Sequence, residues 1–259
     1  MFELNDIYSD FPEILSIKVD DISGAYPPAA LGPLCEEACV CFRTAGIAAV
    51  LVELDLDGFH HMLTRSALTR MYLLEHTPPA ERDASRHCRI SRASGFFDAV
   101  AAGQIELARR IVAAGPQQRN VDYEYEEDYA YVRFLYGLLL GAEDAEQRAI
   151  LDDWKTLLGG AKSAKHAVCQ ALPTRDAAIF DAAFASLLNA RKRDLHKQER
   201  SLNRDEMEFA GGRHVYVEGL AILRIAEVLG IATQPEYKYC PKEARQPMGA
   251  PFSDDLYPR

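Results

Sequence analysis

Glycine and proline divide this chain of 259 residues into short segments, most of which carry apolar residues at the spacing of an α-helix. The segment 56–76 is an example, because Phe59, Met62 and Leu63 share one helix face and Pro78-Pro79 ends the helix. Strand patterns are scarce, and the connections between segments are short. The sequence therefore predicts an all-α fold, an array of roughly nine or ten antiparallel helices.

The two ends of the chain lack this helical pattern. Residues 1–28 mix acids, β-branched residues and turn formers, which predicts an irregular N-terminal segment, with a short strand as the alternative. Residues 234–259 are rich in proline and predict an extended tail. The polar connection 77–89 is a candidate subdomain boundary, but the helices before it make a small core. One domain over residues 1–259 is the preferred organisation.

Composition limits the class of protein. A hydrophobic content of 48% is enough for a buried core, and a net charge of −10 argues against general nucleic-acid binding while it permits a basic protein partner. The first residues show no signal-peptide pattern, and no apolar run is long enough to span a membrane. Six cysteines in a chain of this size favour a reduced setting. We therefore expect a cytoplasmic protein that does not contact membranes.

The negative charge is concentrated in residues 119–153, where ten acids and three arginines leave −7 of the total −10. This region begins with acids and continues into the apolar pattern of a core helix up to Leu140. Such a surface attracts a basic partner. The alternative is that the acids form a solvent-exposed helix start, where they complement the helix dipole and make the protein soluble. The predicted partner-binding surface consists of seven residues: Asp122, Tyr123, Glu124, Tyr125, Glu126, Glu127 and Asp128.

A basic stretch balances this acidic region. Residues 191–205 hold six Lys or Arg and three acids, a net charge of +3. We expect the stretch to pair with the acidic helices within the fold, and contact with nucleic acid is the alternative.

The sequence predicts no catalytic residue, metal ligand or cofactor. The common nucleophile, phosphate-binding and dinucleotide-binding motifs are missing from it. Cys35 and Cys39 share a helix face but lack the spacing of zinc knuckles, so we expect them in the core. His214 and Glu218 have the i, i+4 spacing of a metal pair without an evident third ligand. A metal-dependent hydrolase built on these two residues is the least favoured alternative.

Three stretches together resemble a known family. Residues 86–115 hold Arg86-His87 and then the helix pair GFFDAVAAGQIELARRIVAAG, and residues 122–141 join an acidic, tyrosine-containing start to a long apolar helix. Residues 215–242 form a last helix, a glycine and an extended segment that leads to Tyr239 and Pro241-Lys242. In this order they are similar to the immunity protein 49 family of bacterial polymorphic-toxin systems, over roughly residues 50–245.

The resemblance implies a non-enzymatic all-α protein of the cytoplasm that binds and neutralises a cognate toxin. In such families the toxin is frequently a nuclease delivered by a contact-dependent or type VI secretion route. Toxins that act on nucleic acid tend to be basic, so the resemblance favours docking over solvation for the acidic residues 122–128. A helical scaffold or regulatory adaptor without a toxin partner is the alternative. Neither the toxin nor the oligomeric state is specified by the sequence.

Overall fold

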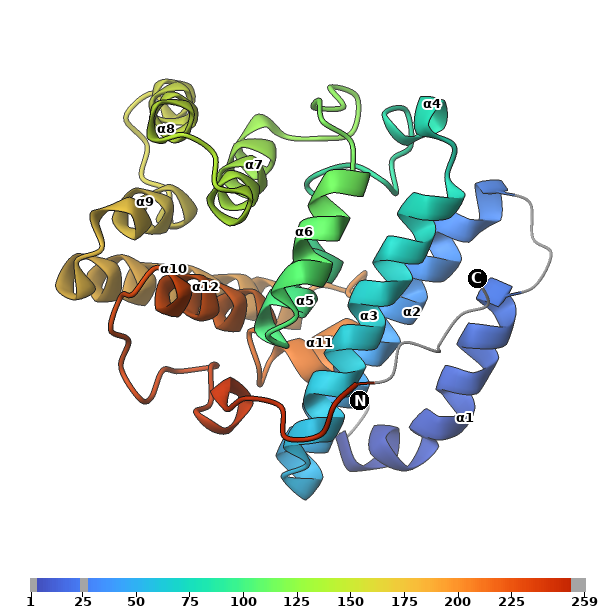
Figure 1. The fold of residues 1–259 in the computed structure, drawn as a ribbon. Coiled ribbons are helices and arrows are strands. Elements are labelled where there is room, and N and C mark those ends of the chain that lie inside the picture. Colours follow the sequence, from blue (N-terminus) through green and yellow to red (C-terminus); the bar gives the residue numbers. More distant parts are fainter. Residues whose placement is uncertain (1–3, 24–27, 253–259) are drawn as a thin grey trace.

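The computed structural model describes residues 4–23 and 28–252, and it confirms the predicted all-α class (Figure 1). The described residues form twelve α-helices and no strand, where the sequence predicted roughly nine or ten helices. The N-terminal helix α1 and the short helices α4 and α11 were not predicted. Gly141 shows how glycine ends a helix here, since it takes a left-handed φ of 72° directly after α7.

The helices alternate with short connections along the whole described chain. Their bounds are α1 Leu4–Ser23, α2 Pro28–Ala48, α3 Leu56–His76, α4 Pro79–Arg82, α5 Ser94–Ala101, α6 Ile105–Ala114, α7 Glu126–Leu140, α8 Asp144–Leu158, α9 Ala164–Ala171, α10 Ala177–Glu199, α11 Glu206–Gly212 and α12 Val217–Val228. A π-helical turn, η1 Ala49–Glu53, continues α2, and two 3₁₀ turns are η2 Leu172–Thr174 and η3 Glu243–Arg245.

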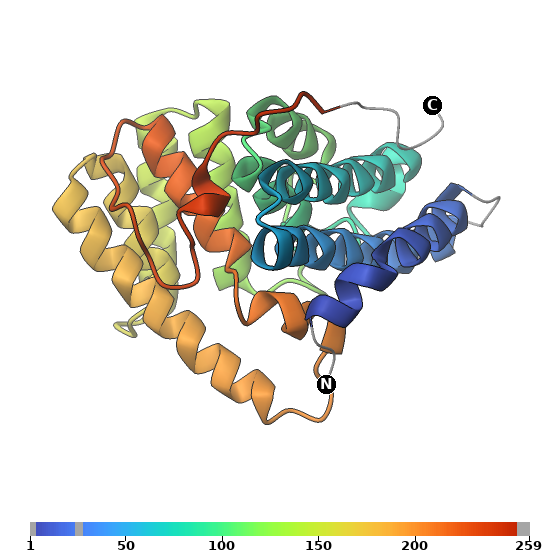
Figure 2. The same ribbon diagram turned by 90° about the horizontal axis from the view of Figure 1, so that it is seen from below.

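The prediction of an irregular N-terminal segment is wrong, because residues 4–23 form the helix α1. Phe11, Leu15 and Ile22 are buried and lie four and seven positions apart, so they make an apolar stripe. The stripe packs on α2, beside which α1 lies in both views (Figures 1 and 2). Acids and β-branched residues give this segment a weak helical propensity of its own. Packing on α2 overrides that propensity.

Helix α5 occupies the centre of the fold. It contacts α3, α6 and α12, and all its residues from Gly95 to Ala101 are buried. Gly95 allows α5 to approach α3 closely, because a Cβ atom at this position would lie 2.4 Å from the Cβ of Arg70. Nearly all buried apolar side chains of the described residues belong to one continuous cluster that extends from α1 to the C-terminal tail. The single-domain organisation stays a prediction.

A buried ion pair joins three of the central helices. Asp98 of α5 is fully buried, and its two carboxylate oxygens each accept a hydrogen bond of 2.7 Å from the guanidinium of Arg43 in α2. The hydroxyl of Ser66 in α3 donates to the same carboxylate at 2.5 Å. Burial alone would lower the pKa of Arg43, but attraction and hydrogen bonding to Asp98 outweigh burial and raise this pKa.

Arg70 attaches the connection 77–89 to the rest of the fold. This buried residue of α3 donates to the carbonyl oxygens of His87, Cys88 and Arg89. A segment that looks like a polar linker is thereby held against α3.

The C-terminal tail has no regular secondary structure as far as the structure describes it, apart from η3 and one isolated bridge, and residues 253–259 lie outside the described part. The tail crosses the molecule to the first turns of α3 (Figure 2). There a carboxylate oxygen of Asp57 accepts from the backbone N–H groups of Gly249 and Ala250, at 2.7 and 3.1 Å. Nε2 of His60 lies 2.8 Å from the carbonyl oxygen of Gln246. Asp57 and His60, with Nε2 of His61 at 3.3 Å from the carbonyl oxygen of Ala250, therefore hold the tail on α3.

Replacing Asp98 with alanine is expected to lower the free energy of unfolding by about 3–5 kcal/mol, because Arg43 is left buried and unpaired. Urea denaturation measures this. The exposed pair Lys18–Glu37 provides the control, since Glu37→Ala should cost less than about 1 kcal/mol. Equal losses in the two variants would contradict the role of the buried pair.

The attachment of the tail is expected to depend on pH. Hydrogen bonds from the backbone N–H groups of Ala250 and Gly249 lower the pKa of Asp57 below its value in the unfolded chain. These bonds therefore stabilise the attached tail fully above about pH 4, and this stabilisation is lost as the pH falls through the lower pKa of the folded protein. Hydrogen exchange at the two amides measures the attachment. Asp57→Asn should weaken protection at neutral pH and remove its acid dependence, whereas Glu53→Gln should change neither. Unaltered protection in Asp57→Asn would refute this attachment.

Candidate functional site

The seven residues of the predicted partner-binding surface lie in two different structural contexts. Helix α7 begins at Glu126, so Asp122 to Tyr125 belong to the loop before it, and Glu126, Glu127 and Asp128 form its first turn. Asp122 is exposed, as are Tyr123 at 50% and Tyr125 at 82% of their surface. Two large aromatic side chains are thus presented to solvent beside the acids.

Glu124 points into the protein rather than toward solvent. Its side chain is only 5% exposed, and its carboxylate accepts from the backbone N–H of Ser91 at 2.6 Å and of Asn120 at 2.7 Å. The hydrogen bond from Ser91 joins the loop before α7 to the loop before α5, and the one from Asn120 closes the loop before α7 on itself. Glu124 therefore stabilises the loop that carries the surface and is inaccessible to a partner.

The three acids of the first helical turn are exposed or half-buried, and each has an internal contact. Glu126 pairs with Arg119 at 3.0 Å, the hydroxyl of Ser163 donates to Glu127 at 2.5 Å, and Asp128 pairs with Lys165 at 2.9 Å. Burial by itself would lower the pKa of Lys165, but the carboxylates of Glu218 and Asp128 raise it. The start of α7 is therefore tied to the start of α9, and its acids are partly neutralised.

The prediction that the basic stretch 191–205 pairs with the acidic helices is wrong for the described residues. Its ion pairs are local, such as Lys197 with Asp194 and Arg204 with Glu206, and Arg191 donates to the carbonyl oxygen of Gly212. The reason is geometric. Helix α10 packs on α9 near its start, and its charged end runs on toward α11 (Figure 2).

The cysteines of α2 pack in the core, as predicted. Cys35, Cys39 and Cys41 are buried, and the thiol of Cys39 donates to the carbonyl oxygen of Ser66 at 3.3 Å. Burial raises the pKa of Cys39 to about 12, which keeps the thiol protonated at neutral pH.

His214 and Glu218 do not share a helix face, because α12 begins only at Val217. His214 accepts from Nε of Arg213, whereas Glu218 accepts from the hydroxyl of Tyr131 at 2.7 Å. The i, i+4 argument for a metal pair therefore has no structural basis. No group of three or more potential metal ligands occurs within residues 4–23 and 28–252.

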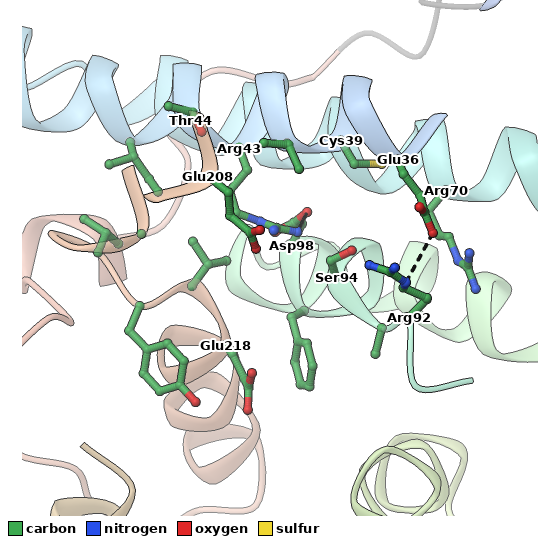
Figure 3. Close-up of a pocket in the computed structure, with 18 of the residues that line it drawn as sticks. Glu36, Cys39, Arg43, Thr44, Arg70, Arg92, Ser94, Asp98, Glu208 and Glu218 are labelled. Atoms are coloured by element: carbon green, nitrogen blue, oxygen red, sulfur yellow. Dashed lines mark hydrogen bonds and ion pairs between the residues drawn. The ribbon is translucent and has the colours of Figure 1, made fainter. Parts of the chain in front are cut away.

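A cavity of about 300 Å³ lies between α2, α5 and the start of α12 (Figure 3). Arg43 and Asp98 line one side, and Glu218 lies across from them. Near one end, Nε of Arg92 pairs with the carboxylate of Glu36 at 3.3 Å. This cavity could not be predicted from the sequence, because its charged residues come from distant segments.

The charges around this cavity compensate one another. Its lining holds four acids and four arginines, which are Glu36, Asp98, Glu208 and Glu218 with Arg43, Arg70, Arg92 and Arg191. Burial and the nearby Glu218 raise the pKa of Tyr131 well above its usual value, so the phenol stays a hydrogen-bond donor to that carboxylate. The arrangement is suited to holding α2, α5 and α12 together and presents no activated nucleophile.

Comparison with known proteins decides the family. The sequence model of the immunity protein 49 family matches residues 55–244, well over half of the chain. The chain belongs to the immunity protein 49 family. No match was found among curated proteins or among solved structures.

The region shared with the immunity protein 49 family begins at the N-cap of α3 and ends within η3. The acidic loop, α7 and α8 lie inside it, whereas α1, α2 and the tail beyond Ala244 lie outside. The ion pair between Arg43 and Asp98 joins the two parts. None of the described helices is long and apolar enough to cross a membrane.

Glu124→Ala is expected to lower the free energy of unfolding by at least about 2 kcal/mol, because two N–H groups lose a charged acceptor. Denaturant unfolding measures the loss. Glu126→Ala is the matched control in the same segment, and it should cost less than about 1 kcal/mol because its ion pair is exposed. If Glu124 were an ordinary surface residue, Glu124→Ala and Glu126→Ala would lower the free energy of unfolding by similar amounts.

Proposed function

We propose that this protein is an immunity protein that neutralises a cognate bacterial toxin by direct contact, without catalysis. Its membership of the immunity protein 49 family carries the proposal. The protein would act in the cytoplasm and protect the cell that produces the toxin, along with its kin. The proposed toxin is a basic protein, such as a nuclease delivered by a contact-dependent or type VI secretion route.

The proposed contact surface is the acidic region around the start of α7. Six of its seven predicted residues, all except the buried Glu124, remain candidates for direct contact. Their support is the combination of exposed tyrosines and acids, since tyrosine often anchors interfaces and clustered acids attract a basic partner over long range. The internal pairs of Glu126 and Asp128 reduce the local charge but leave both carboxylates about half exposed.

Co-expression tests the function itself. The product of the adjacent toxin gene, produced with this protein, should be retained in a pull-down and should lose its toxicity. Survival of the host and recovery of a complex are the measurements. A toxin that stays free and lethal in the presence of this protein would refute the proposed function.

Neutralising the accessible acids tests the surface. The quadruple variant Asp122→Asn, Glu126→Gln, Glu127→Gln, Asp128→Asn, with Glu124 retained, should bind the toxin about 10–100-fold more weakly and with a flatter salt dependence. Titration at several salt concentrations measures both effects.

A second quadruple variant controls for total charge. Asp10→Asn, Glu13→Gln, Asp20→Asn and Glu53→Gln change exposed acids of α1 and η1, which lie across the molecule from α7 (Figure 1). This variant should bind nearly as tightly as the original protein. Equal weakening in both variants would show that only the overall charge matters.

A further inference from the structure

A groove of about 370 Å³ lies between α7 and α8, next to the acidic loop. Four large apolar or aromatic side chains line it together with Ala130: Tyr129, Ile150, Trp154 and Leu157. Leu157 is 46% exposed, whereas Tyr129 and Ile150 are half-buried. The groove is therefore an apolar recess at the outer edge of the molecule, where α7 and α8 lie (Figure 1).

Charged side chains surround the apolar lining. Four of them form two ion pairs, in which the opposite charges cancel. The pairs are Glu126 with Arg119 at 3.0 Å and Glu146 with Arg133 at 3.2 Å. Asp153 has no ion-pair partner among the described residues. Because residues 119–153 carry a net charge of −7, a cation is favoured beside this groove.

Trp154 forms the buried floor of the groove. The residue is 1% exposed, and its indole N–H has no hydrogen-bond acceptor within the described residues. Its ring packs against Tyr131 and His166, so Trp154 contributes a buried aromatic surface and not an accessible donor.

Exposed apolar side chains extend the surface beyond the groove. Val121, Tyr123 and Tyr125 are 70%, 50% and 82% exposed in the loop between Arg119 and Glu126, and both of these charged residues line the groove. Aromatic and aliphatic groups around a recess, with charges at the rim, are typical of the centre of a protein interface.

We infer that the α7–α8 groove binds a segment of the toxin in which one large apolar side chain is flanked by Lys or Arg. The apolar side chain packs on Ile150 and Leu157, above the buried ring of Trp154, and the flanking cation pairs with Asp153. This inference rests on the proposed function and assigns the toxin's anchor to residues outside the seven predicted from the sequence.

Two pairs of variants test the groove by toxin affinity. Leu157→Arg should weaken binding at least about tenfold, because it places a cation in the apolar recess, whereas Leu140→Arg should not, since Leu140 is 49% exposed and outside the lining. Asp153→Asn should weaken binding about 2–5-fold, and the adjacent Asp152→Asn, outside the lining, less than about twofold.

Trp154 reports occupancy directly because it is the single tryptophan of the chain. With fluorotryptophan incorporated, its fluorine NMR resonance should shift when unlabelled toxin is added. Binding with an unmoved resonance, or equal effects within each pair of variants, would overturn the groove and leave the proposed function standing. Failure of the original protein to bind the toxin would overturn both.

Discussion

The fold depends on one buried ion pair. Asp98 sits on the most buried helix, α5, and its carboxylate is satisfied by Arg43 from α2 and Ser66 from α3. A buried charge is tolerated only when its partners are held in place, so this carboxylate fixes the relative positions of three helices. Because α2 lies outside the region shared with the family and α5 inside it, the pair also attaches the first helices to the family core.

The helices of this chain could be predicted where apolar periodicity and stop signals agree. α3 covers the segment 56–76 that its apolar spacing and the prolines after His76 predict, and the class follows from the sum of such segments. α1 could not be predicted in the same way, because its helical state depends on packing against α2. Short helices such as α11 bury too few residues to give a periodic pattern.

The candidate site was less predictable than the fold. The sequence shows how many acids lie between Asp122 and Asp128, but it does not show which ones contact the protein itself. Glu124 is chemically equivalent to its neighbours, and only the approach of the loop at Ser91 makes it a buried acceptor. The α7–α8 groove could not be predicted either, because in the sequence Ile150 and Leu157 look like ordinary core residues of an amphipathic helix. How much of these two side chains stays exposed depends on how closely α8 packs on α7, and the spacing of apolar residues does not indicate this.

The burial of all six cysteines has a practical consequence. All six are free thiols; Cys35, Cys39 and Cys41 lie in α2, and the others are Cys88, Cys169 and Cys240, the last in the tail. Burial raises the pKa of Cys39 and of Cys240 to about 12, so a thiol reagent reacts with them only when their surroundings open. The native chain thus contains its own reporters of local opening. A single cysteine introduced at the surface would be labelled selectively, without removal of the others.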